Sequence, residues 1–312
     1  MQACPPHPDG YGETVSRLTK TVTESDTLRR AAIPAYRAYA RAVVFHRGPR
    51  VLANSQPKSG THLVASLLKN LPEMMFSGRH YSLHNFEFPD APQATERNGV
   101  WKLDWERLER SLKAVNKGQF MTSHFAALPE LLSLLDSLDF KIIATLRDPR
   151  DVAVSNAFYI TGLKRHFLHD RFHTEFTTPE QRLMATITGF PPRDGFRGLG
   201  SIASGVRRYM AWHDDPNTYV CRFENLVGSP GGGSDEAQHR EVNAIAHHVG
   251  RELNPEEVDG TARKTWSPTS STFRKGAVGD WRNHFTDEHK SAFKAVAGDE
   301  LIELEYEKGY DW

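Results

Sequence analysis

The chain lacks the features that mark disulfide-rich, membrane-spanning and nucleic-acid-binding proteins. Only two of its 312 residues are cysteines, Cys4 and Cys221, so we expect no structural disulfide and a reducing, cytoplasmic location. No run of about 18 apolar residues is present, and residues 1–8 lack the apolar segment of a secretory signal, so neither a membrane span nor secretion is expected. The 39 basic residues equal the 39 acidic ones, which argues against a nucleic-acid partner.

The sequence divides into an N-terminal segment and one large domain. Residues 1–45 are predicted to form a polar tail and a helical segment, and residues 46–312 a single domain. The Gly-rich stretch 228–234 is interpreted as a loop within that domain rather than a linker.

Short β-rich runs alternate with helical patterns along this domain. Strands are predicted at 50–55, 119–123, 140–146 and 218–223, a helix at 129–138, and irregular structure over 76–100. Such alternation is typical of an α/β fold in three layers, with a central parallel sheet and helices on both faces.

The most informative stretch is Pro57-Lys58-Ser59-Gly60-Thr61-His62-Leu63, between the first predicted strand and a helical pattern. A strand, a Gly-containing turn and a helix present backbone N–H groups to an anion. The stretch lacks GxxxxGK[ST], because its lysine precedes its one glycine, so the usual ATP or GTP signature is absent.

Two further segments carry polar residues suited to binding phosphate. Residues 146–155 begin with Leu146-Arg147-Asp148-Pro149, in which Asp148 is a good N-cap and Pro149 suits the first helical position. Residues 272–285 contain Arg274, Lys275 and Gly276. Arginine offers a fork of donors, lysine a point charge, and glycine a close approach of the backbone.

In order and spacing, these three segments resemble the signatures of the soluble, cytosolic-type sulfotransferases, from about residue 50 to the C-terminus. The resemblance implies a P-loop-like phosphosulfate-binding loop, the cosubstrate 3′-phosphoadenosine-5′-phosphosulfate (PAPS) and the product 3′-phosphoadenosine-5′-phosphate (PAP). It assigns the 5′-phosphosulfate to Lys58, Ser59, Gly60, Thr61 and His62. It assigns the 3′-phosphate to Arg147, Ser155, Arg274, Lys275 and Gly276.

The chain departs from the family pattern at three positions. His62 stands in place of a threonine, and Leu63 in place of the tryptophan that stacks on adenine in many relatives. Phe223 and Trp266 are the candidate replacements for that tryptophan. Thr122 stands where relatives often have lysine, which removes one charge near the sulfuryl group.

Sulfuryl transfer needs a base for the proton of the acceptor and a cation for the leaving phosphate. His124 follows a predicted parallel strand, matches the catalytic histidine of the family, and has an ordinary pKa near 6.5. The predicted catalytic residues are therefore His124 as base, Lys58 as cation, and Ser155. No metal is required. The helical spacing of His166, His169 and His173 is interpreted as a solvated face or lid rather than a metal site.

The acceptor is expected to be a small molecule, bound by aromatic residues within 76–88 and 159–200. A phenol, an aliphatic alcohol, an amine, a natural product and a carrier-tethered compound all fit this pattern. Residues 283–287 do not match the dimer motif of animal relatives, so no oligomeric state is predicted.

Two other functions would use the same phosphate-binding turn. One is a kinase-like phosphotransferase, against which the missing Walker lysine and residues 272–285 argue. The other is a catalytically silent nucleotide-binding module, against which the joint presence of Lys58, Ser155 and His124 argues.

Overall fold

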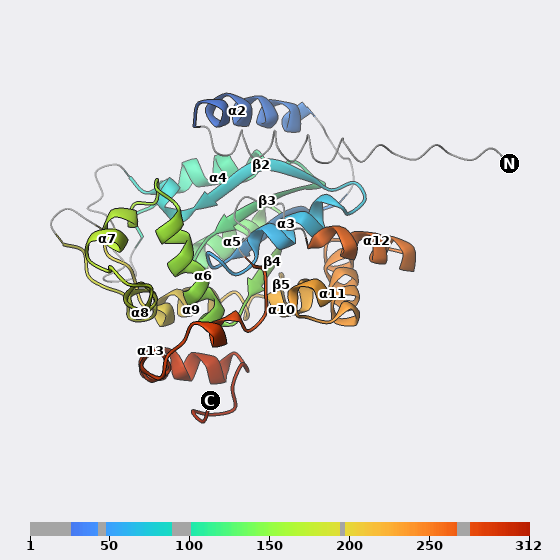
Figure 1. Cartoon of the computed structure of the whole chain (residues 1–312). Helices are drawn as coiled ribbons and strands as arrows, with labels where there is room; N and C mark the ends of the chain where they lie inside the picture. Colours follow the sequence, from blue (N-terminus) through green and yellow to red (C-terminus); the bar gives the residue numbers. More distant parts are fainter. Residues whose placement is uncertain (1–25, 43–47, 89–100, 194–196, 267–274) are drawn as a thin grey trace.

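A parallel sheet forms the centre of the molecule (Figure 1). The computed structural model describes residues 26–42, 48–88, 101–193, 197–266 and 275–312. Within them, five strands lie in the order β2-β3-β1-β4-β5, and each pairs with its neighbours in parallel. Their bounds are β1 Arg50–Ser55, β2 Met75–Ser82, β3 Gln119–His124, β4 Phe140–Leu146 and β5 Thr218–Arg222.

Helices and short 3-10 turns connect and cover the strands. Those before β4 are α2 Asp26–Ala42, α3 Thr61–Lys69, η1 Leu83–Phe86, α4 Trp105–Lys113 and α5 Pro129–Ser137. Those between β4 and β5 are α6 Pro149–Gly162, α7 His169–Thr174, α8 Pro179–Thr188 and α9 Ile202–Met210. Those after β5 are α10 Phe223–Leu226, η2 Ser229–Gly231, α11 Asp235–His248, α12 Pro255–Thr265, η3 Asp280–Asn283 and α13 Asp287–Glu303.

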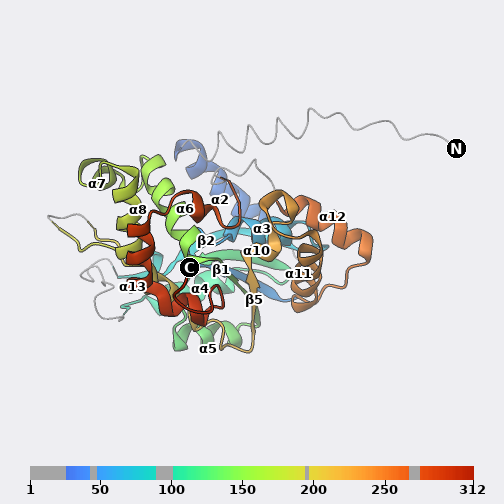
Figure 2. The same ribbon diagram turned by 60° about the horizontal axis from the view of Figure 1, so that its bottom comes forward.

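Both faces of the sheet are buried, because successive side chains of each strand point to opposite sides. Val51 packs with the buried residues of α3, α11 and α12, whereas Leu52 packs with those of α4 and α5. Figures 1 and 2 show the sheet between these two groups of helices. The predicted three-layer α/β fold with a parallel sheet is confirmed.

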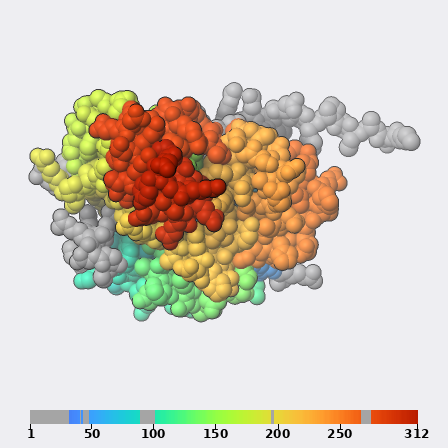
Figure 3. Space-filling model, turned by 90° about the horizontal axis from the view of Figure 1, so that it is seen from below, coloured from blue at the N-terminus to red at the C-terminus, as the bar shows by residue number. Residues whose placement is uncertain are grey.

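A third apolar cluster joins the C-terminal part of the chain to the helices that follow β4. Buried residues of α6, α8 and α9 pack against Phe293 and Leu301 of α13. Seen from below, the C-terminal segment covers the middle of the molecular surface (Figure 3, red). Residues 275–286, which lead into α13, thereby lie beside the start of α6.

The strands expected at 50–55 and 140–146 are confirmed with those bounds, and those at 119–123 and 218–223 to within one residue. The irregular structure expected over 76–100 is wrong for residues 76–82, which belong to β2, and residues 89–100 lie outside the described residues. An irregular register between Phe76 and His80 breaks the regular alternation that marks a strand. No helix among the described residues is long and apolar enough to span a membrane.

Candidate active site

The turn between β1 and α3 has the geometry of an anion-binding loop. Lys58 (φ 73°) and Gly60 (φ 111°) adopt left-handed conformations on either side of the buried Ser59. The amide of Ser59 donates to the carbonyl of Gln56 at 3.1 Å, and Gly60 is the N-cap of α3. The first amides of a helix have no partners within it, so this turn suits an anion.

Close packing at Gly60 and two side-chain contacts hold the turn in place. A Cβ atom at Gly60 would lie 2.9 Å from Cδ2 of Phe223, which explains glycine at this position. The hydroxyls of Ser55, at the end of β1, and Thr61, at the start of α3, are hydrogen-bonded to each other. The ammonium of Lys58 lies 4.0 Å from the centre of the Tyr159 ring on α6, close enough for a cation–π contact.

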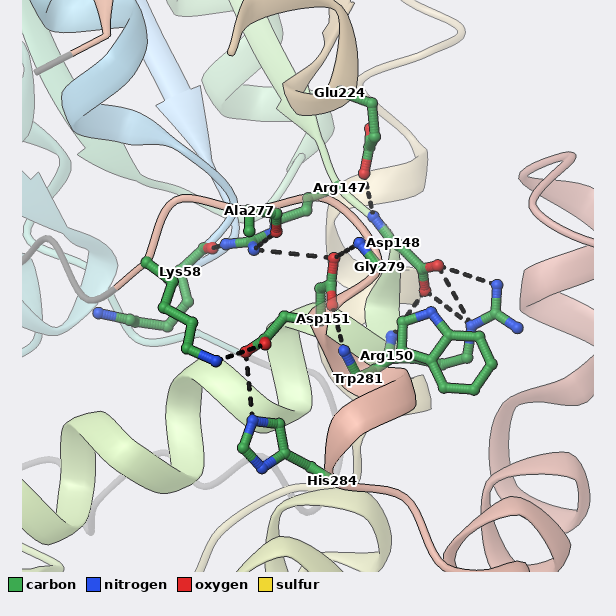
Figure 4. A network of polar contacts seen from close by, with 12 residues as sticks. Lys58, Arg147, Asp148, Arg150, Asp151, Glu224, Ala277, Gly279, Trp281 and His284 are labelled. Carbon is green, nitrogen blue, oxygen red and sulfur yellow. Dashed lines mark hydrogen bonds and ion pairs between the residues drawn. The ribbon is translucent and has the colours of Figure 1, made fainter. Parts of the chain in front are cut away.

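Arg147, at the end of β4, joins this turn to the C-terminal loop (Figure 4). Its guanidinium donates to the carbonyls of Lys58 and Ala277, each at 3.1 Å, and lies 4.0 Å from the centre of the Phe223 ring. It also lies 3.8 Å from the carboxylate of Asp151 on α6. Arg147 is only 7% exposed, so it binds the loops together from inside the protein.

Asp151 fixes the C-terminal loop to α6. Its two carboxylate oxygens accept the amides of Gly279 and Trp281, each at 2.8 Å, as Figure 4 shows. Burial raises the pKa of Asp151, although Arg147 and these amides act in the opposite direction. Within the loop, Asp280 pairs with Lys275 at 3.0 Å and with His284 at 3.2 Å.

The start of α6 follows the prediction. The Asp148 carboxylate accepts the amide of Arg150 at 2.9 Å, which confirms it as N-cap, and Pro149 begins the helix. The same carboxylate binds the Arg150 guanidinium, with contacts from 2.9 to 3.2 Å. Ser155 lies further along α6 and is half-buried.

His124 is the last residue of β3, at the carboxyl end of the sheet. Its Nδ1 lies 2.7 Å from the backbone carbonyl of Ser55. A carbonyl oxygen only accepts, so Nδ1 carries the proton and the neutral ring keeps its lone pair on Nε2. Burial, together with His80, lowers the pKa of His124 to about 3, so the ring is neutral at pH 7.

A family model of the sulfotransferase domain matches residues 49–305 of this chain. The chain belongs to the sulfotransferase family.

Among individual sulfotransferases, the 3-alpha-hydroxysteroid sulfotransferase of Cavia porcellus is 26% identical over 176 residues, which cover 50% of this chain and 54% of the relative. This chain therefore spans about half the length of that relative. A glycolipid sulfotransferase of Mycobacterium tuberculosis is 24% identical over 296 residues, covering 76% of this chain and 86% of the relative.

Solved sulfotransferase structures share the fold. The crystal structure of mouse sulfotransferase SULT7A1 complexed with PAP has a TM-score of 0.55 and 20% identity. The match covers 84% of this chain and 88% of that chain. The P-loop-like turn between β1 and α3 thus lies in a sulfotransferase fold, as the sequence predicts.

Two more histidines lie near His124. His80 of β2 contacts the His124 ring, with centroids 4.8 Å apart, and His62 is the second residue of α3. Both side chains are exposed, but protein atoms around each ring still desolvate it and lower its pKa. No sequence pattern gives His80 a role of its own, because an irregular strand lacks the alternation from which to place its side chains.

His166 is a third histidine near the turn. Its ring contacts Tyr159, whose ring also faces Lys58. Burial, together with His169 and Lys58, lowers the pKa of His166 to about 4. His169 and His173 stack on α7 with centroids 4.1 Å apart. No group of three or more His, Cys, Asp or Glu residues in the described ranges is arranged to hold a metal ion.

The structure brings together most of the predicted donor-site residues but not all of them. Arg147 lies between the Lys58 turn and the loop that contains Gly276 (φ 58°). Phe223 is buried, with Arg147 over its ring, and Trp266 ends α12. Arg274 lies outside the described residues. The donor contacts of all these residues stay predictions.

Proposed function

We propose that this sulfotransferase moves the sulfuryl group of PAPS to a hydroxyl or amine of a small-molecule acceptor, with His124 as general base. The observation that carries the proposal is the 2.7 Å contact between Nδ1 of His124 and the Ser55 carbonyl. This contact leaves Nε2 as the proton acceptor of a neutral ring at the carboxyl end of β3. Active sites of parallel α/β sheets gather at that end.

The residues around the turn fit an anionic donor. Left-handed backbone at Lys58 and Gly60, followed directly by the N-terminus of α3, makes a concave set of amide groups suited to phosphate. We place the 5′-phosphosulfate at residues 58–62. We place the 3′-phosphate between Arg147, Ser155 and residues 274–276. In PAPS the sulfuryl group is bonded to the 5′-phosphate. When the sulfuryl group moves to the acceptor, PAP departs with that phosphate as the leaving group.

Three residues of the chain carry the chemistry in this proposal. His124 accepts the acceptor proton at Nε2 while the Ser55 carbonyl holds the opposite nitrogen. Lys58, positioned beside Tyr159, offsets the negative charge that develops on the leaving phosphate. Ser155 helps to hold the 3′-phosphate, which orients the donor relative to these two residues.

The names of the relatives guide the choice of acceptor. One acts on hydroxysteroids and one on glycolipids, according to their names. Both classes offer hydroxyl groups on largely apolar molecules. We therefore propose a hydroxyl-bearing apolar small molecule as the first class to screen, with phenols and amines as separate arms of the screen.

A thermal-shift panel tests the donor. PAP should raise the melting temperature, because a ligand that binds only the folded state stabilises it. AMP, which lacks the 3′-phosphate, should raise it far less. An equal shift with AMP, or a preference for ATP with Mg²⁺, would contradict the assignment. Transfer of labelled sulfuryl groups from PAPS to the acceptor panel then tests the reaction itself.

A further inference from the structure

Strand β2 contains an irregularity next to the candidate active site. Phe76 pairs with Phe120 of β3, and the next pair along the ladder joins His80 to Thr122. Between these pairs β2 advances by four residues and β3 by two. A regular ladder would place Gly78 opposite Thr122. The bulge places His80 there instead, and bulges commonly redirect side chains next to active sites.

Helix α2 holds the bulge in place. The Tyr36 hydroxyl donates to the carbonyl of Phe76, and Nε of Arg37 donates to the carbonyl of Gly78, each at 3.0 Å. Gly78 has φ 73°, and a Cβ atom there would lie 2.9 Å from the Tyr36 ring. The conformation that presents His80 therefore depends on contacts from a helix about 40 residues earlier in the chain.

The ring of His80 contacts two residues of β3. Its Nδ1 lies 2.9 Å from the hydroxyl of Thr122. Its ring meets that of His124 edge to face, with centroids 4.8 Å apart and planes at 83°. Thr122 and His124 are two positions apart on β3, so they point to the same side of the sheet. His80 thus links the two side chains on that side.

We propose that His80 is a positioning residue for His124, held by the β2 bulge and by Thr122. This inference rests on the proposed role of His124 as base. The hydrogen bond from Nδ1 of His124 to Ser55 holds the ring at one nitrogen, and turning of the ring about its Cβ–Cγ bond would break this hydrogen bond and redirect Nε2. The perpendicular His80 ring limits that turning and so fixes the direction in which Nε2 points.

The same contacts affect the protonation of His124. The ring is approached by His80 from β2, His62 from α3 and Lys58 from the turn. Each of these basic groups disfavours a second positive charge nearby, whereas the hydrogen bond to Ser55 favours the protonated ring. Removing His80 should therefore raise the pKa of His124 and leave its ring less ordered.

Two substitutions at His80 separate positioning from proton transfer. His80→Ala removes the ring, whereas His80→Phe keeps an aromatic edge without ring nitrogens. We expect His80→Ala to lower kcat by about tenfold to a hundredfold, the size of effect that misplacing a reacting group produces. We expect His80→Phe to recover most of that loss. The dissociation constant for PAP should change less than about twofold in both, because the hydrogen bond and the ring contact of His80 are with Thr122 and His124 of β3 rather than with the donor turn.

Thr122→Val and His247→Ala complete the series. Thr122→Val keeps the volume of the side chain nearly constant but removes the hydroxyl that is hydrogen-bonded to His80. It should also lower kcat, by a smaller factor than His80→Ala. His247 is an exposed histidine on α11, near Glu252, and lies outside every segment proposed to bind donor or acceptor, so His247→Ala should leave kcat unchanged. Wild-type kcat in His80→Ala overturns the inference, and so does a His80→Phe variant as slow as His80→Ala.

Nitrogen-15 NMR of the histidine rings gives a readout that does not need turnover. In the wild type, His124 should show one neutral tautomer, protonated at Nδ1. In His80→Ala, the second tautomer should appear and the pKa of His124 should rise. An unchanged His124 spectrum in that variant overturns the positioning role. If the spectrum changes as expected but no acceptor is sulfated by the wild type, the proposed function fails while the positioning role stands.

Discussion

His124 owes its protonation state and its tautomer to its surroundings. An ordinary histidine is half-protonated near pH 6.5. Burial, His80 and other basic neighbours lower the pKa of His124 to about 3, and the Ser55 carbonyl selects the tautomer. The lone pair on Nε2 is therefore available throughout the physiological range of pH.

Replacing His124 tests this role directly. His124→Ala should lower turnover by at least about a hundredfold, the lower end of the contribution of a general base. The dissociation constant for PAP should stay nearly the same, as measured by calorimetry. The exposed His247 on α11 provides the matched variant, His247→Ala, which should retain turnover. Near-normal turnover in His124→Ala would move the base to another residue, with His62 the next candidate.

The charge of Lys58 should matter more in the transition state than in the bound donor, because negative charge grows on the leaving phosphate as the bond breaks. Lys58→Met keeps the apolar stem next to Tyr159 and removes the charge. We expect kcat to fall by about 10²–10³-fold, with a smaller change in the dissociation constant for PAPS. Lys113→Met, in an exposed ion pair with Glu109 on α4, is the control. A loss confined to donor affinity would make Lys58 a binding residue only.

The C-terminal loop depends on α6 for its position. Two of its amides bind one carboxylate, that of Asp151, which is 1% exposed. Arg147 adds a contact to the carbonyl of Ala277. The proposed donor site thus draws on three segments, at residues 57–61, 147–155 and 275–281, that meet around the buried Arg147 and Asp151.

Asp151→Asn should loosen this loop while α6 stays folded. The asparagine side chain has one oxygen and one NH₂ group. Only one of the two backbone amides, those of Gly279 and Trp281, therefore keeps its acceptor, and the other faces a donor. We expect the free energy of unfolding to fall by about 1–3 kcal/mol, the cost of leaving a buried polar group unsatisfied, and PAP to bind more weakly. Chemical denaturation and calorimetry measure the two effects. Asp170→Asn, at an exposed position on α7, should change neither. Wild-type stability in Asp151→Asn would contradict the anchoring role.

Several histidines make the stability of the folded chain depend on pH. The pKa values of His62, His80, His124 and His166 are all lowered in the folded state. Below about pH 6.5 the unfolded chain binds protons that these folded rings do not, so the free energy of unfolding decreases as the pH falls. The decrease continues down to the folded-state pKa values, about 3 for His124 and about 4 for His166.

The melting temperature should therefore fall between pH 7 and pH 5. His124 alone contributes about 2 kcal/mol of this loss, since one pKa unit corresponds to about 1.4 kcal/mol and the ring stays neutral in the folded protein over that range. Calorimetry at several pH values measures the change. The His124→Asn variant should show a shallower dependence on pH. A melting temperature that is constant or rises from pH 7 to pH 5 would contradict the lowered pKa values.

Local signals in the sequence were enough to predict much of the fold. The strands at 50–55 and 140–146 are short β-rich runs next to polar turns, and the start of α6 follows from Asp148 and Pro149. These features depend on neighbouring residues, which a sequence displays directly. The order of the three motif segments was likewise enough to predict membership of the sulfotransferase family.

Contacts between distant residues decided the remaining features. Strand β2 and the place of His80 depend on a bulge held by α2, and Arg147 reaches backbone carbonyls that lie 89 and 130 residues away in the chain. The low pKa of His124 comes from burial and from three basic groups on other segments. Desolvation and electrostatic interactions depend on distance in space, so they take their values only once the chain has folded.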